Sequence, residues 1–237
     1  MSTVVDFHSH ILPGIDDGSK STEESVAMLQ MEWDQGISRV VATPHFYPQH
    51  DQLNRFLDRR RQAEEILREK TQGIMQLPVL HMGAEVHFFQ GISDCEELPL
   101  LTVDGGNYIL IEMPYAPWTD EMYYQLESIY TKRNLHPIIA HVDRYVKGLQ
   151  TAKMVQRLAD LPVLVQANAE FFLDKWKQKK GLHMLRDGKI HLLGSDCHNL
   201  TSRKPNLEAA LKKIEKYLGK DTISQINHYE QTVFSDK

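Results

Sequence analysis

Short segments rich in Val, Ile and Leu alternate along the chain with longer amphipathic stretches. Runs such as Arg39-Val40-Val41-Ala42 and Tyr108-Ile109-Leu110-Ile111 are almost continuously apolar, as in strands that are buried on both faces. The pattern predicts seven strands, at Thr3–His10, Arg39–His45, Val79–His87, Tyr108–Met113, Pro137–Val142, Pro162–Ala167 and Ile190–Ser195.

Helical patterns fill most of the intervals between these strands. Ser21-Thr22-Glu23-Glu24 forms a capping box, and the helix that begins there runs to Gly36. Apolar positions at helical spacing predict further helices at Leu53–Gln72, Thr119–Lys132, Thr151–Ala159, Leu207–Leu218 and Thr222–Val233. Gly91–Asn107 has no such pattern and is expected to be a loop or an irregular insertion.

The alternation of strand and helix predicts an α/β fold with a parallel sheet and right-handed crossovers. Seven strand–helix units favour a distorted TIM-like barrel, and a doubly wound open sheet is the alternative. Both folds place their functional sites at the carboxyl ends of the strands. No low-complexity tract or internal repeat divides the 237 residues, so residues 1–237 are expected to form a single domain.

The composition excludes several classes of function. The hydrophobic share of 41% and the charged share of 25% are typical of a soluble globular protein. A net charge of −5 disfavours sequence-independent binding of nucleic acid. No apolar run is long enough to cross a bilayer, and the first residues lack a signal-peptide pattern, so we expect a cytoplasmic protein.

Potential metal ligands follow almost every predicted strand. Strand side chains alternate, so His8 with His10, and Asp196 with His198, can point into one site. The other candidates at strand ends are His45, Glu85, His87, Glu112, His141 and Asp143, and Asp16 or Asp17 lies in the loop after the first strand. The sixth strand offers only the amides of Gln166 and Asn168.

Buried carboxylates and imidazoles in such numbers need a compensating charge, which bound cations supply. Imidazole and carboxylate ligands without thiolate suit Mn, Zn or Fe in hydrolytic sites. The ligands are too many for one ion. A cluster of two or three ions activates water and stabilises in-line displacement at phosphorus.

These residues resemble the polymerase and histidinol phosphatase (PHP) superfamily. The resemblance rests on Asp6–His10, Asp16–Gly18, Thr43–His45, Gly83–Glu85, Ile111-Glu112, Ala140–Tyr145 and Ser195–Asn199. Within the superfamily, Ile15–Gly18 and Asn199–Arg203 are similar to the bacterial capsule-type tyrosine-protein phosphatases. The match covers the chain from about His8 to Arg203.

The resemblance implies a PHP fold, a distorted barrel of seven strands with three divalent metal ions. Mn²⁺ is expected first, and Zn²⁺ or Fe is an alternative. One ion would be held by His8, His10, Glu85 and Asp196. A second would be held by Glu112 and His141 with Glu85 as a bridge, and a third by Asp17, His45 and His198. Arg144 and Arg203 match the arginines that contact phosphate in the family, a role that the guanidinium fork suits.

The implied activity is hydrolysis of phosphotyrosine on a bacterial tyrosine kinase that controls capsule or exopolysaccharide synthesis. The attacking group would be a metal-bridging hydroxide, with the two arginines orienting the phosphoryl oxygens. Two alternatives are a histidinol-phosphate or other small phosphomonoester phosphatase, and a non-catalytic scaffold.

A third alternative is a cysteine-dependent phosphatase, because Cys197 and Arg203 fit a Cys-x5-Arg pattern. Residues 198–202 contain no glycine, although the phosphate-cradling loop of that class usually needs one. Cys197 also lies between Asp196 and His198, whose side chains are expected to point into the site. Because strand side chains alternate, the Cys197 side chain should point away from the metals.

Other residues complete the expected surroundings of the site. His87 shares a face with Glu85 and is a candidate to support the ligands, whereas Tyr115 and Trp118 follow a ligand-bearing strand and are candidates to line the cleft. Trp33, Trp118 and Trp176 are expected to be packing residues, with the cleft as the alternative for Trp118.

Overall fold

The computed structural model describes residues 4–146 and 150–235. Every strand pairing among them is parallel. The strands are β1 Val4–Ser9, β2 Ile37–Ala42, β3 His45–Phe46, β4 Val79–Met82, β5 Glu85–His87, β6 Tyr108–Glu112, β7 His136–Ile139, β8 Leu164–Asn168 and β9 Leu192–Gly194. The predicted parallel α/β class is therefore confirmed.

Two of the seven predicted strands are interrupted. The segment Arg39–His45 becomes β2 and β3, and Val79–His87 becomes β4 and β5. Pro44 has no N–H to donate to a ladder, so the regular pairing ends before it. The chains still pair across the break, where Gly83 donates to the carbonyl of Ala42 at 2.9 Å and Glu85 donates to that of Pro44 at 3.0 Å.

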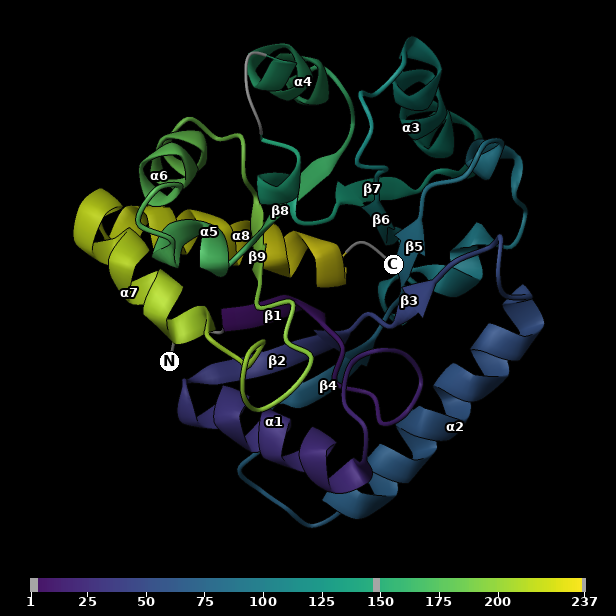
Figure 1. Ribbon diagram of the computed structural model, residues 1–237, viewed down its shortest axis with the longest axis vertical. Coiled ribbons are helices and arrows are strands. Elements are labelled where there is room, and N and C mark those ends of the chain that lie inside the picture. The colour runs from purple at the N-terminus through teal and green to yellow at the C-terminus, as the bar shows by residue number, and fades with distance from the viewer. Residues whose placement is uncertain (1–3, 147–149, 236–237) are drawn as a thin grey trace.

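The strands form a three-stranded sheet, β1-β2-β4, and a six-stranded sheet, β3-β5-β6-β7-β8-β9. A parallel bridge between Ser9 and Cys197 joins the end of β1 to the segment after β9. The backbone of His10 donates to Cys197 at 2.9 Å, and that of Asp196 donates to His8 at 2.7 Å. The first and last strands therefore lie side by side near the centre of Figure 1.

Helices lie around the strands, as Figure 1 shows. They are α1 Thr22–Asp34, α2 Leu53–Thr71, α3 Asp120–Arg133, α4 Gln150–Ala159, α5 Glu170–Leu173, α6 Gln178–Arg186, α7 Leu207–Leu218 and α8 Lys220–Ser235. The predicted cap of α1 is present, with the Ser21 hydroxyl accepting from the Glu24 N–H at 3.2 Å. The sequence pattern missed α5 and α6. No helix in the described parts of the chain has the length and apolarity that crossing a bilayer demands.

The expected irregular insertion at Gly91–Asn107 is confirmed. It contains three short 3-10 helices, η1 Ile92–Asp94, η2 Leu98–Leu101 and η3 Val103–Gly105, in place of a crossover α-helix. A fourth, η4 Val142–Arg144, follows β7.

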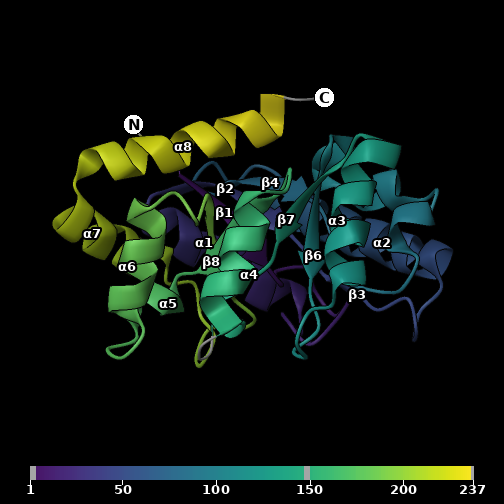
Figure 2. The same ribbon diagram turned by 90° about the horizontal axis from the view of Figure 1, so that it is seen from above.

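Helix α8 lies across one end of the strands (Figure 2). Phe234 packs against Phe7 with ring centroids 5.5 Å apart, and the Glu230 carboxylate accepts a hydrogen bond from the Val5 N–H at 3.2 Å. Val5 lies near the start of β1, so α8 covers the amino ends of the strands and leaves the carboxyl ends free. The packing role expected for Trp176 is wrong, because this side chain is 94% exposed.

Candidate metal centre

The carboxyl ends of the strands bring all nine predicted ligands into one connected cluster. Seven of the nine are buried, and only His45 and Asp17 have appreciable exposure. The nine are His8, His10, Asp17, His45, Glu85, Glu112, His141, Asp196 and His198.

Glu85 lies at the centre of this cluster, at the start of β5. Its Oε2 is 3.2 Å from His8 Nε2 and 3.3 Å from His10 Nε2. The same oxygen is 2.9 Å from His45 Nδ1, and Oε1 is 2.7 Å from His141 Nε2. The break between β4 and β5 places Glu85 at the start of β5, where it pairs with His45 of β3 on one side and Leu110 of β6 on the other.

Asp196 is a second centre, in the segment after β9. Its Oδ1 lies 3.6 Å from His8 Nε2, 3.5 Å from His10 Nε2 and 2.8 Å from an Arg203 guanidinium nitrogen. The guanidinium of Arg144 contacts Oδ2 and also lies 3.7 Å from Glu112 Oε1. Both predicted arginines therefore lie at the rim of the cluster.

The exposed end of the cluster is formed by Asp17. Its Oδ1 is 3.3 Å from His45 Nε2 and 3.4 Å from His198 Nε2, while Oδ2 lies 4.0 Å from Arg203. At the other end, Glu112 Oε1 is 3.5 Å from His141 Nε2.

Three of the histidines have one ring nitrogen committed to an oxygen acceptor. His10 Nδ1 donates to Asp16 at 2.8 Å, His198 Nδ1 donates to the Asp196 carbonyl at 2.9 Å, and His8 Nδ1 donates to Gln166 at 3.3 Å. A neutral imidazole that donates through Nδ1 presents a lone pair at Nε2, which is the form that binds metal. The three Nε2 atoms all face the interior of the cluster.

The electrostatics of the cluster favour added positive charge. Burial opposes ionisation of Glu85, but the surrounding histidines hold its pKa well below its usual value. Burial likewise opposes charge on His10, but Asp16, Asp196 and Glu85 raise its pKa well above its usual value.

The residues present fit bound cations. His8 Nε2 and His10 Nε2 lie only 3.1 Å apart, and two lone pairs at that distance repel unless a proton or cation lies between them. Ring nitrogens lie 2.9–3.3 Å from the buried Glu85 Oε2, and Asp17 Oδ1 lies 3.4 Å from His198 Nε2, but among the described residues neither atom makes a contact with the geometry of a hydrogen bond. A divalent cation satisfies these atoms without protonating them.

Two ligands lie on strained backbone. His141 and Asp196 have φ values of 33° and 54°, a left-handed region that residues other than glycine adopt at a cost of about 1–3 kcal/mol. Such strain persists where the surrounding structure fixes it, and both side chains point into the cluster. The sequence gives no sign of these conformations.

Three residues that the sequence named only as a possible ligand or as strand-end amides support the ligands. Asp16 accepts from His10 and from the backbone N–H groups of Gly18 and His45, so it orients His10 while Asp17 faces the cluster. On β8, Gln166 accepts from the His141 N–H at 2.6 Å, and Asn168 donates to Asp196 at 2.9 Å. Both amides were named at the end of the sixth predicted strand, and their i, i+2 spacing on β8 places them on the same face as the ligands.

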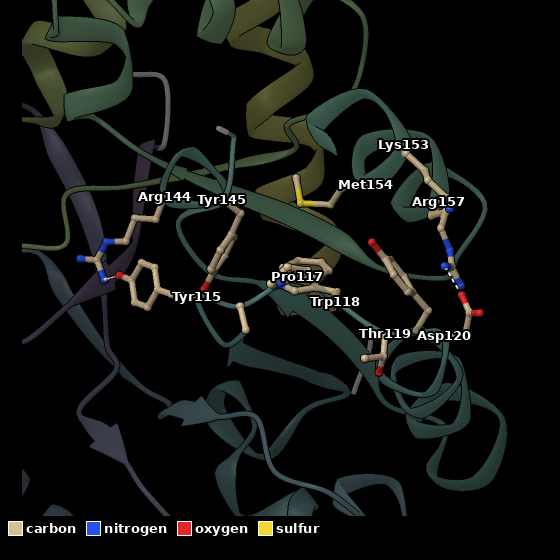
Figure 3. Close-up of a pocket in the computed structure, with 12 residues that line it drawn as sticks. Tyr115, Pro117, Trp118, Thr119, Asp120, Arg144, Tyr145, Lys153, Met154 and Arg157 are labelled. Atoms are coloured by element: carbon tan, nitrogen blue, oxygen red, sulfur yellow. Dashed lines mark hydrogen bonds and ion pairs between the residues drawn. The ribbon is translucent and has the colours of Figure 1, made fainter. Parts of the chain in front are cut away.

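His87 was identified as a candidate support, and it lies where that role requires. Its Nδ1 is 3.2 Å from Glu112 Oε2. The cleft residues Tyr115 and Trp118 line a groove with a volume of about 620 Å³, and Arg144 lies at one end of it (Figure 3). Arg144 also contacts the ligands Asp196 and Glu112, so this end of the groove adjoins the cluster.

The chain is similar to known proteins over nearly its whole length. Residues 4–233 match the family model described as capsular polysaccharide synthesis, CpsB/CapC. The tyrosine-protein phosphatase CpsB of Streptococcus pneumoniae is 30% identical over 231 residues, which cover 91% of each chain. The tyrosine-protein phosphatase YwqE of Bacillus subtilis is 27% identical, with 92% of this chain and 86% of YwqE covered.

The fold also matches a solved structure. A structure from work on YwqE of Bacillus subtilis and CpsB of Streptococcus pneumoniae, described as unique metal-dependent tyrosine phosphatases, aligns with a TM-score of 0.86 at 21% identity. The alignment covers 99% of this chain and 96% of that one. The chain belongs to the CpsB/CapC family of capsular polysaccharide synthesis proteins.

Proposed function

We propose that this protein is a metal-dependent tyrosine-protein phosphatase. It hydrolyses phosphotyrosine on a bacterial tyrosine kinase that controls capsule or exopolysaccharide synthesis. The observation that carries this proposal is the cluster of nine imidazole and carboxylate ligands with two arginines at its rim, in a chain whose relatives are named tyrosine-protein phosphatases.

The ligand set supports three divalent ions. The ligand atoms of His8, His10 and Glu85 lie within 4.8 Å of one another, with Asp196 close by, and this group would hold one ion. The ligand atoms of His10, Asp17, His45 and His198 form a second such group. Glu85 and Glu112 belong to a third such group, and His141 Nε2 lies within 3.5 Å of a carboxylate oxygen of each. Mn²⁺ suits these oxygen and imidazole ligands, and Zn²⁺ or Fe is the alternative.

Bound cations would supply a water of lowered pKa and positive charge opposite the phosphoryl oxygens. The residues of the chain provide the rest. Arg144 and Arg203 are held at the rim by Asp196, so their guanidinium groups are positioned before substrate arrives. Bidentate hydrogen bonds from these arginines orient the phosphoryl group and offset its developing charge. Tyrosine leaves with a pKa near 10, so its departure needs little help from a general acid.

The buried state of Cys197 argues against the cysteine mechanism. Burial, together with Glu32 and Asp6, raises the pKa of this thiol well above its usual value. A thiol that stays protonated is a poor nucleophile. Its Sγ points toward Glu32 at 3.9 Å, away from the ligands.

We also propose a single phosphatase domain over residues 1–237, built as a distorted barrel of seven strand–helix units. The bridge between Ser9 and Cys197 supports this, because it joins the two sheets through their first and last strands. We propose further that the protein is cytoplasmic and that its partner is the kinase. We propose that it neither binds nucleic acid nor inserts into a membrane.

One set of assays tests the function. The purified protein is assayed on a phosphotyrosine peptide and on histidinol phosphate, with chelator, with added Mn²⁺ and as Cys197→Ser. We expect turnover of the peptide that chelator abolishes, that Mn²⁺ restores and that Cys197→Ser retains. Preference for histidinol phosphate would favour the small-ester alternative, and activity that survives chelation but is lost in Cys197→Ser would contradict the metal mechanism. Absence of all turnover would favour a scaffold.

A further inference from the structure

The groove beside the metal centre has an aromatic wall that begins at a ligand. The Tyr145 ring lies 5.7 Å from that of His141 and 5.1 Å from that of Trp118, measured between ring centroids. Trp118 in turn lies 5.7 Å from Tyr123, as measured between the two rings. Tyr145 is the C-cap of η4, Trp118 lies in the segment after β6 and Tyr123 lies on α3. All three line the same groove as Met154, and Figure 3 shows Tyr145 and Trp118 beside it.

Two cationic side chains lie at the far end of the groove. Lys153 and Arg157 reach it from α4, and the Arg157 guanidinium lies 3.7 Å from the centroid of the Tyr123 ring. Among the described residues that line the groove, Asp120 is the only acidic one, and it pairs with Arg157 at 2.5 Å. Two cations thus face one carboxylate, in a chain whose net charge is −5.

We propose that this groove binds the peptide segment next to the phosphotyrosine and selects an acidic side chain in that segment. This inference rests on the phosphotyrosine activity proposed above. The phosphate lies at the Arg144 end, and the backbone and flanking side chains lie along the aromatic wall. Lys153 and Arg157 bind the acidic side chain at the other end. The carboxylate of Asp120 is 94% exposed and competes with the peptide for Arg157.

The dimensions of the groove suit this occupant. Steps of 5.1, 5.7 and 3.7 Å lead from Tyr145 through Trp118 and Tyr123 to Arg157. Placed end to end, these steps span a distance that about four extended residues cover. The volume of about 620 Å³ is that of a site for a ligand much larger than a lone phosphate ester.

Charge complementarity gives the reason for an acidic side chain. The protein surface as a whole repels anions, so a local positive end of a groove is the place where an acidic peptide gains most by binding. Both cations lie partly in solvent, so each ion pair raises the affinity for the peptide by only a modest factor, and this gain falls as salt is added.

The test compares two phosphotyrosine peptides of equal length with the Mn²⁺-loaded enzyme. One carries glutamate within four residues on each side of the phosphotyrosine, and the other carries alanine there. We expect kcat/KM to be about threefold to tenfold higher for the acidic peptide at low salt, through KM rather than kcat. The ratio between the two peptides should fall toward one in Lys153→Glu and rise in Asp120→Asn. Lys220→Glu on α8, a charge reversal outside the groove, should leave the ratio unchanged.

The outcomes separate the two proposals. Equal kcat/KM for the two peptides would overturn the assignment of the groove, and so would a preference that Lys153→Glu and Asp120→Asn leave intact. A preference expressed in kcat alone would also overturn it, because binding at a distance from the phosphate should act on KM. Failure of the wild-type enzyme to hydrolyse either peptide, or p-nitrophenyl phosphate, would instead overturn the proposed phosphatase function.

Discussion

Asp16 accepts hydrogen bonds from His10, Gly18 and His45, whereas the carboxylate of the adjacent Asp17 faces His45 and His198. The sequence could not separate these two neighbours by spacing, and only the resemblance favoured Asp17 as a ligand. Their different surroundings now support that choice. The pKa of Asp16 is held below its usual value, because the contacts with His10, Gly18 and His45 outweigh burial.

Asp16→Asn tests the orienting role. The amide removes a negative charge from His10 Nδ1, so the lone pair at Nε2 becomes less basic and the ring less well fixed. We expect affinity for Mn²⁺, measured by calorimetry on the metal-free protein, to fall about tenfold to a hundredfold. Asp34→Asn, an exposed change on α1, is the matched control. Unchanged affinity in Asp16→Asn would mean that His10 does not depend on this carboxylate.

At the scale of an element, the interrupted strands decide where the ligands lie. A continuous strand over Arg39–His45 was predicted from its apolar run, and the break at Thr43-Pro44 was not. Proline and glycine at these points do signal an interruption, but they do not say how the chain continues after it. In the same way, the charged run Lys175–Lys180 masked the start of α6, although Leu182 and Leu185 are buried.

Gly194→Ala tests how closely β9 must approach the ligands. A Cβ on Gly194 would lie 2.5 Å from His8 Cβ and 2.8 Å from Gln166 Nε2, so His8 must move. We expect a loss of stability of about 1–3 kcal/mol in urea unfolding and a loss of kcat/KM of about a hundredfold.

Gly83→Ala provides the matched control, because its Cβ would meet its nearest neighbour at an ordinary 3.4 Å. Gly83→Ala should keep near wild-type activity. If Gly194→Ala also kept near wild-type activity, the ligands would tolerate a displaced His8.

At the scale of the whole molecule, a buried acid links α8 to the start of β1. Burial raises the pKa of Glu230 to about 8, against an ordinary value of 4.5. The folded protein therefore keeps a proton that the unfolded chain releases. The free energy of unfolding should then fall as pH rises from about 4.5 to about 8, and this contribution should stay constant above that range.

Glu230→Gln removes this dependence and keeps an oxygen for the Val5 N–H. Relative to wild type, we expect the variant to gain about 3–5 kcal/mol of stability between pH 5 and pH 8.5, measured by urea unfolding of the metal-free protein. Asp221→Asn on the same helix should show no such gain over this range. Parallel pH profiles for wild type and Glu230→Gln would mean that the acid is charged in the folded state.

Much of the molecule could be predicted from its sequence, for a physical reason. Buried parallel strands are apolar throughout, so a polar residue such as His8 or Glu112 near the end of one stands out, and all nine candidate ligands do meet. What could not be predicted depends on contacts between distant segments. Examples are the left-handed backbone at His141 and Asp196, the hydrogen bonds between the β8 amides and the ligands, and the exposure of Trp176.

The bridge between Ser9 and Cys197 has a consequence for synthesis of the protein. The first ligands to leave the ribosome, His8 and His10, must wait for Asp196 and His198 before their site is complete. Contacts of such long sequence separation form late in folding. At about 5–20 residues per second, the nascent chain remains inert for most of its translation, so phosphatase activity begins only when nearly the whole chain has been made.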